Sequence, residues 1–280
     1  MDVQLVGDPW DFTRRAAGFL EREAFTANVI GVVAERIAAG AQPPSEDAVW
    51  ALVTNGLDEV VGVAMQTPPH FLFLPRLPEH APELLAHLLA GARRPLPGVN
   101  GEAESGRRYA AEWRRLTGQS SEVQTAMRFY VLGTLRPPEG VNGSPRLATD
   151  ADQAILTAWE SAFFEEVNPQ APHDDPSDTA RRRIAHGEAW LWEDGGEVVS
   201  MACVSKPSAG VARLGPVYTP LERRGHGYAS SVTAVASQAG LDSGARHVAL
   251  YADVRNATSN KIYQAIGYLP DHDAEERRFL

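Results

Sequence analysis

Hydrophobic and polar residues alternate along the first half of the chain with two distinct periods. Apolar positions at helical spacing predict helices, and short runs of β-branched and aromatic residues predict strands. The predicted helices are two within residues 12–40, separated near residues 26–28, and one each at 83–92 and 106–117. The predicted strands are 48–54, 60–66, 71–74, 96–103 and 124–132.

The second half of the chain has the same kinds of pattern. Asp194, Gly195 and Gly196 separate two apolar runs and are typical of a hairpin turn. The predicted strands are 146–148, 188–193, 197–205, 212–219 and 247–254. The predicted helices are 150–167, 178–186, a run of small residues at 230–239, and a segment from Asn256 that ends at Gly267.

The elements in the second half have the order β-α-α-β-β-β-α-β-α-β. The elements predicted in the first half have a matching order. This order predicts an α/β fold with a mixed sheet, and it indicates that the first half is a degenerate copy of the second. An unrelated α/β domain is the alternative. We expect a structural or acceptor-side domain at 1–135, a linker rich in proline and glycine at 136–145, and a second domain at 146–280.

Length and composition narrow the classes of protein. A chain of 280 residues is long for one typical domain and fits two. The formal net charge of −10 argues against general binding of nucleic acid. The single cysteine, Cys203, lies in an apolar run and excludes an internal disulfide framework. No secretory signal or membrane-spanning run is visible, so we expect a cytoplasmic protein that does not enter a membrane.

The most informative stretch follows the predicted strand 212–219. Arg224, Gly225 and Gly227 lie in a turn that opens a predicted helix. Backbone N–H groups at a helix start attract anions, and glycine lets a ligand approach the main chain closely. Arg223 and Arg224 add positive charge for phosphate oxygens. The turn is neither the G-x-G-x-x-G fingerprint of dinucleotide-binding proteins nor a P-loop, because it lacks the Lys-Ser/Thr pair.

Two motifs together resemble a known family. The turn reads R-x-x-G-x-A from Arg224 to Ala229, and the later segment reads N-x-x-S-N-x-x-Y-x-x-x-G-Y from Asn256 to Tyr268. In this order and at this separation they resemble the GCN5-related N-acetyltransferase (GNAT) superfamily. The resemblance implies the acyl-CoA N-acyltransferase fold, in two tandem copies. It covers roughly residues 145–280 by motif, and the first half only by topology.

The resemblance implies direct acetyl transfer from acetyl-CoA to an amine of a small molecule or peptide, with no metal and no covalent enzyme intermediate. A monomer or a homodimer is compatible with it. A non-catalytic acyl-CoA-binding or regulatory module is the alternative function. By position in the motifs, the residues expected to bind the coenzyme are Val217, Tyr218, Thr219, Arg224, Gly225, His226, Gly227, Tyr228, Ala229, Asn256, Asn260 and Tyr263. For Asn260 and Ser259 the alternative is a cap of the helix.

Tyr263 is the candidate general acid for the departing thiolate, because a phenol can donate a proton to sulfur. The alternative is a tyrosine that only packs against the pantetheine arm. Four acidic or histidine side chains border the expected acceptor cleft and are weak candidates for the general base. They are Glu165, Glu166, His173 and Asp174.

The first half has a different turn at the corresponding place. After the strand 71–74 the chain runs through Pro75, Pro78 and Pro82 and contains no glycine before the next helix. Proline has no N–H to donate to an anion. We therefore expect that no pyrophosphate binds in the first half.

Overall fold

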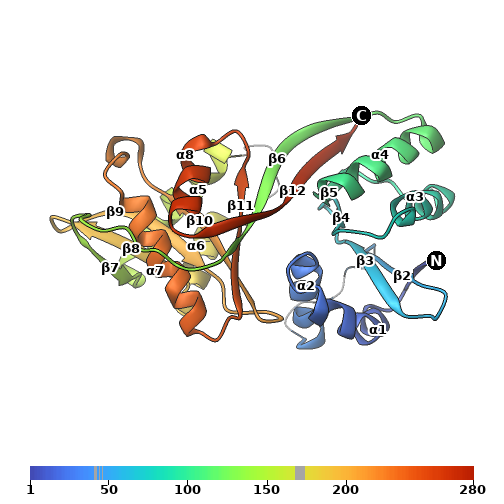
Figure 1. Ribbon diagram of the computed structural model, residues 1–280, viewed down its shortest axis with the longest axis horizontal. Coiled ribbons are helices and arrows are strands. Elements are labelled where there is room, and N and C mark those ends of the chain that lie inside the picture. Colours follow the sequence, from blue (N-terminus) through green and yellow to red (C-terminus); the bar gives the residue numbers. More distant parts are fainter. Residues whose placement is uncertain (41–42, 44, 46, 168–173) are drawn as a thin grey trace. The chain divides into compact units, whose positions relative to one another are not determined.

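A computed structural model describes residues 1–40, 43, 45, 47–167 and 174–280. The chain divides into an N-terminal unit, Met1–Met127 with His272–Leu280, and a C-terminal unit, Arg128–Asp271. Figure 1 shows the helices and strands of both in the colours of the sequence.

The N-terminal unit is built around a mixed sheet whose strand order is β1-β2-β3-β4-β5-β12. Its strands are β1 (Asp2–Leu5), β2 (Val49–Thr54), β3 (Val60–Gln66), β4 (Leu72–Leu74), β5 (Gly98–Glu102), the first part of β6 (Ser121–Leu132) and the last part of β12 (Tyr268–Phe279). Its helices are α1 (Pro9–Arg22), α2 (Asn28–Ala38), α3 (Ala81–Gly91) and α4 (Ala103–Thr117).

Alternation along the strands of the N-terminal unit divides its core between two faces. Trp50 and Leu52 of β2 pack with α1 and α2, whereas Ala51 and Val53 pack with α3 and α4. Asp8 caps α1 and Glu102 caps α4 through their carboxylates, which accept hydrogen bonds from backbone N–H groups. The unit is therefore a sheet covered by a helix pair on each face.

The C-terminal unit repeats this arrangement with the strand order β6-β11-β10-β9-β8-β7. Its remaining strands are β7 (Ser144–Leu147), β8 (Ala189–Asp194), β9 (Glu197–Val204), β10 (Val211–Tyr218) and β11 (His247–Asp253). Its α-helices are α5 (Gln153–Val167), α6 (Pro176–His186), α7 (Tyr228–Asp242) and α8 (Ala257–Ala265). Two short 3-10 helices are η1 (Asp150–Asp152) and η2 (Leu221–Arg223).

Two helix pairs again cover the two faces of the sheet. Met201 and Cys203 of β9 belong to the cluster under α5 and α6, and Ala202 and Val204 belong to the cluster under α7 and α8. Cys203 is fully buried and burial raises the pKa of its thiol to about 12, so it is a core residue as expected. The mixed α/β fold and the repeated order of elements are thus as the sequence predicts.

The division of the chain differs from the expected boundaries at 1–135 and 146–280. Residues 128–135 group with the C-terminal unit, and His272–Leu280 groups with the N-terminal unit. The reason is the length of β12, whose later residues pair with β5, from Ala274 opposite Glu102 to Arg278 opposite Gly98. The sequence analysis also did not predict β1, which pairs with β2.

The end of β12 contributes to the core of the N-terminal unit, and this gives a test. Phe279 is buried and its ring stacks on Trp113 and Tyr109, with ring centroids 5.6 and 6.4 Å apart. Phe279→Ala should lower the free energy of unfolding by about 3–5 kcal/mol, measured by urea denaturation. Leu280→Ala is the control, because Leu280 is exposed, and it should change stability by less than about 0.5 kcal/mol. Equal stability of the two variants would contradict the assignment of this strand to the N-terminal core.

Candidate active site

The central feature of the C-terminal unit is the separation of β10 from β11. The two parallel strands pair only at Val211–His247, Ala212–Val248 and Arg213–Ala249, within the residues that the structure describes. Beyond this point β10 pairs with β9 alone, and an irregularity between Leu214 and Val217 shifts its register. Main-chain groups of β10 that would face β11 are therefore available to a ligand, because unpaired backbone groups seek hydrogen bonds.

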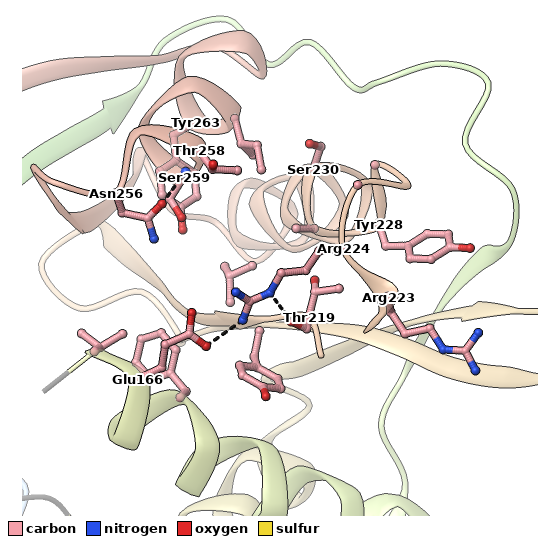
Figure 2. A pocket seen from close by; sticks show the side chains of 18 residues that line it. Glu166, Thr219, Arg223, Arg224, Tyr228, Ser230, Asn256, Thr258, Ser259 and Tyr263 are labelled. Atoms are coloured by element: carbon pink, nitrogen blue, oxygen red, sulfur yellow. Dashed lines mark hydrogen bonds and ion pairs between the residues drawn. The ribbon is translucent and has the colours of Figure 1, made fainter. Parts of the chain in front are cut away.

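A pocket of about 410 Å³ lies at this separation. The start of α7 lines it on one side, α8 on another, and the end of α5 on a third (Figure 2). Val217, Tyr218 and Thr219 at the end of β10 contribute to its wall. The residues of both sequence motifs thus meet at one cavity.

The first turn of α7 has the donors that a phosphate group needs. Its N-cap is Gly227, with a φ of 84° and no side-chain cap hydrogen bond among the described residues. The first intrahelical bond joins Ser231 N to Gly227 O at 3.0 Å, so the N–H groups of Tyr228, Ala229 and Ser230 have no intrahelical acceptor. A Cβ at position 227 would lie 2.8 Å from Cγ2 of Val141, and the positive φ would strain any other residue, so the position favours glycine. These donors and the positive end of the helix fit the pyrophosphate of coenzyme A.

Arg224 is held by an ion pair across the pocket. Its Nη2 lies 2.7 Å from Oε2 of Glu166 at the end of α5, and its Nε donates to Thr219 O at 2.9 Å. Figure 2 shows the guanidinium between Thr219 and the Glu166 carboxylate. The hydrogen bond that Arg224 donates to Glu166 is the largest of the effects that raise the pKa of Arg224. Both side chains are partly exposed, so a phosphate group can compete for the guanidinium.

Arg223 and Tyr228 present less to the cavity than the sequence suggests. The Arg223 guanidinium pairs with Glu197, and the Tyr228 hydroxyl donates to Asp194. In Figure 2 both side chains point away from Arg224 and Tyr263. Tyr228 therefore offers the pocket its backbone N–H rather than its phenol.

Tyr263 of α8 lies at the inner wall of the pocket. It is nearly buried, and its ring contacts those of Tyr130 and Tyr268, with centroids 6.3 and 6.0 Å apart. Burial raises the pKa of its hydroxyl to about 12, so the phenol stays protonated at neutral pH. Its hydroxyl has no hydrogen-bond partner in the described part of the chain. It is therefore free to donate to a ligand in the cavity.

The two asparagines of the second motif have different surroundings. Asn256 lines the pocket, and its Oδ1 caps α8 by accepting from Ser259 N at 3.0 Å. Asn260 does not line the pocket. Its Nδ2 donates to the main-chain oxygens of Asp253 and Asn256, each at 2.8 Å. The structure thus places Asn260 as an internal clamp of α8, whereas the sequence motif suggested a direct contact with the coenzyme.

Most of the other residues expected at the site line the pocket. Glu166 does, whereas Glu165, Asp174 and His226 do not, and His173 lies outside the described residues. The sequence analysis did not assign several lining residues to the site. They are Phe163, Val167, Ser230, Thr258, Ser259 and Ile262. Most lie within one helical turn of an expected residue, so the helical period could have found them.

The corresponding place in the N-terminal unit is closed. β4 and β5 stay paired up to Leu74, the last residue of β4, which lies opposite Gly101. A Cβ at Gly101 would lie 2.0 Å from Leu74 O, which shows how closely the strands approach. The N-cap of α3 is His80, with a φ of 69°, and Pro82 follows in the first turn. This geometry supports the expectation that no pyrophosphate binds there.

Comparisons with known proteins agree with this site. Residues 153–268 match the family model of the acetyltransferase (GNAT) family. This part of the chain is a GNAT acetyltransferase domain. It contains the start of α7 and the whole of α8, so the family match includes the pocket. The family match supports acyl transfer from acetyl-CoA by the C-terminal unit.

Solved structures extend the likeness to both units. A GNAT-family acetyltransferase from Colwellia psychrerythraea has a TM-score of 0.60 at 12% identity, covering 100% of this chain and 99% of that one. A GCN5-related N-acetyltransferase from Sphaerobacter thermophilus has 0.64 at 16%, covering 99% and 95%. A tandem GNAT protein of the clavulanic acid biosynthesis pathway, solved without acetyl-CoA, has 0.56 at 14%, covering 100% and 98%. At these identities the likeness shows the fold alone.

No curated protein matched the sequence. No described helix is long and apolar enough to span a membrane. Among residues 1–40, 43, 45, 47–167 and 174–280, no group of three or more histidine, cysteine or acidic side chains is placed to hold a metal ion.

The role of the α7 N-terminus can be tested at Ser230, which lines the pocket in the first helical turn. Ser230→Asp should weaken the binding of coenzyme A by about tenfold or more, because the carboxylate repels the phosphates. An acidic residue in the first turn favours the helix, so the fold is retained. Calorimetric titration measures the affinity. Ser230→Asn is the matched neutral control, and equal affinities of the two variants would contradict a phosphate site at this helix.

The ion pair between Arg224 and Glu166 predicts a variant that binds coenzyme A more tightly. Glu166→Gln should strengthen the binding of coenzyme A about threefold to tenfold, because it releases Arg224 and removes a negative charge near the phosphates. The gain should shrink as salt is raised from 50 to 500 mM. Glu165→Gln is the control, since Glu165 does not line the pocket. Weaker binding by Glu166→Gln would show that the carboxylate orients Arg224 for the phosphate rather than competing with it.

Proposed function

We propose that the C-terminal unit transfers an acetyl group from acetyl-CoA to a primary amine of a small molecule or peptide, by direct attack in a ternary complex. One observation carries this proposal. A single pocket unites the free N–H groups of the α7 start with the Tyr263 phenol, across the separation of β10 and β11. The first feature suits the phosphates of coenzyme A, and the second suits the sulfur at the other end.

The strand between these two features would bind the middle of the coenzyme. Val217 lies beyond the last pair between β10 and β11 and lines the pocket, so the strand edge at this position is the place for the pantetheine amides. Thr219 O already accepts from Arg224, which leaves its N–H as the available group. A backbone N–H at this strand would also stabilise the negative charge that develops on the carbonyl oxygen.

The reaction needs two proton movements. The amine nitrogen forms a bond to the acetyl carbon, the carbon–sulfur bond breaks with its electron pair going to sulfur, and the amine loses one proton. In this proposal Tyr263 gives its phenolic proton to the leaving thiolate and is later reprotonated from solvent. The raised pKa of Tyr263, about 12, keeps that proton in place until the thiolate forms.

Glu166 is the carboxylate that we propose for the amine side. It lines the pocket from α5, opposite α8, whereas Glu165 does not line it. Once phosphate groups bind Arg224, the Glu166 carboxylate is released, so it can attract a protonated amine and accept the proton that the ammonium loses before attack. The proton that the neutral amine then loses as the amide forms goes to solvent. Glu166→Gln is therefore expected to bind coenzyme A more tightly and yet transfer acetyl groups more slowly.

The proposal is tested with a panel of primary amines, including amino acids, polyamines, aminoglycosides and lysine peptides. Full-length protein is mixed with acetyl-CoA, and the release of free thiol is followed together with the mass of the acetylated product. Thiol release that depends on one class of amine supports the transferase. Tight coenzyme binding without transfer to any amine would favour the acyl-CoA-binding module instead.

Tyr263→Phe tests the proton donor. With an accepted amine, kcat should fall by about 100-fold, the lower end of the range for general acids, because thiolate is already a good leaving group. Binding of coenzyme A should persist, since the ring and its packing remain. Turnover equal to that of the original protein would assign the ring to packing alone.

A further inference from the structure

Tyr130 lies beside the active-site helix although it precedes the GNAT domain in the sequence. It belongs to β6, the strand that ends the first copy of the fold, and it is completely buried. From Arg128 onward the chain is part of the C-terminal unit, so Tyr130 belongs to the same unit as Tyr263. The family model begins only at residue 153 and does not include it.

The Tyr130 hydroxyl makes two hydrogen bonds to α8. It donates to Oδ1 of Asn260 at 2.7 Å and accepts from Nε2 of Gln264 at 3.2 Å. These two residues are one helical turn apart on the same side of α8. One buried hydroxyl thus restrains both the position of α8 along its axis and its rotation about that axis.

Asn260 passes this constraint to the start of the helix. While its Oδ1 accepts from Tyr130, its Nδ2 donates to the main-chain oxygens of Asp253 and Asn256. Asp253 is the last residue of β11, and Asn256 is the N-cap of α8. The amide group therefore joins Tyr130, β11 and the helix start in one network.

Tyr263 lies between the two residues that Tyr130 contacts. Its ring packs on that of Tyr130, with centroids 6.3 Å apart, and on that of Tyr268, whose hydroxyl lies 2.7 Å from Ser237 Oγ on α7. The end of α8 is also held, because Gly133 N donates to Gly267 O at 3.0 Å and Arg136 N donates to Ile266 O at 2.9 Å. The segment that follows Tyr130 therefore contacts α8 at its end as well.

We propose that Tyr130 is a positioning residue for the acetyl transfer. Through Asn260 and Gln264 it sets the depth at which the Tyr263 phenol enters the pocket. This inference rests on the proposed role of Tyr263, and it gives the first copy of the fold a part in the chemistry of the second. Because small displacements of a catalytic group cost large factors in rate, the loss of one hydroxyl should be visible in turnover.

The test replaces Tyr130 with phenylalanine in the full chain, which keeps the ring and removes the hydroxyl. With an accepted amine, kcat should fall about tenfold, while KM for acetyl-CoA changes less than about twofold because the phosphate site is untouched. Tyr109→Phe is the matched control. Tyr109 is also completely buried, lies in α4 of the N-terminal unit, and its hydroxyl has no hydrogen-bond partner within the described residues.

A double-mutant cycle shows whether Asn260 carries the effect. Asn260→Leu should lower kcat at least as much as Tyr130→Phe, and the double variant should be no slower than Asn260→Leu alone. A purely structural role would lower the midpoint of thermal unfolding and leave the turnover of each folded molecule unchanged. That outcome, or fully additive effects, would overturn the proposal.

A binding experiment separates this inference from the failure of amine transfer. Calorimetry compares coenzyme A with desulfo-coenzyme A, which lacks the sulfur. The original protein should prefer coenzyme A about threefold or more, as expected for one hydrogen bond to sulfur. Tyr263→Phe and Tyr130→Phe should both reduce that preference, and Tyr109→Phe should keep it. An unchanged preference in Tyr130→Phe, or no preference in the original protein, would overturn the positioning role whatever the acceptor is.

Discussion

The C-terminal unit depends on two parallel strands that pair over three positions and then separate. A sheet interior normally satisfies its backbone groups by pairing, so a separation needs another partner for them. The helices that follow each strand begin at the opening, and the uncapped N–H end of α7 and the Asn256 cap of α8 both line the same cavity. Close packing keeps α7 in place, because a Cβ at Gly240 would lie 3.0 and 3.1 Å from methyl groups of Val248 and Val204. The binding site is thus a consequence of where the strand pairing stops.

The N-terminal unit has a different geometry at the corresponding place, because β4 is only three residues long and pairs with β5 along its whole length. The unit has the same order of elements, and Leu77 N donates to Ser105 Oγ of α4 at 3.0 Å. The left-handed His80 and the adjacent Pro82 replace the glycines of the other unit. The pocket of the C-terminal unit therefore has no counterpart with the same turn in the N-terminal unit, and the family match covers residues 153–268 only.

The fold and most of the pocket residues could be predicted because both depend on motifs whose residues lie a few positions apart in the sequence. The turn at Gly225 and Gly227 and the segment from Asn256 to Tyr263 each lie within a few residues, so their spacing is visible along the chain. Contacts between distant residues are not visible in this way. Arg224 pairs with Glu166, 58 positions earlier, and Tyr130 bonds to Asn260, 130 positions later. Nothing local to Asn260 distinguishes a clamp from a ligand, since the same amide suits both roles.

The pairing of His272–Leu280 with the N-terminal sheet affects the order in which the two units can fold. The N-terminal unit contains residues 1–127, but its sheet also needs the strand at 272–280, which the ribosome makes only after residues 128–271. During synthesis the edge of β5 that later pairs with β12 is without that partner while the whole C-terminal unit emerges. An unpaired strand edge is a site for wrong pairing and aggregation, and domains otherwise tend to fold in order from the N-terminus. The N-terminal unit can therefore complete its sheet only after the C-terminal unit has been synthesised.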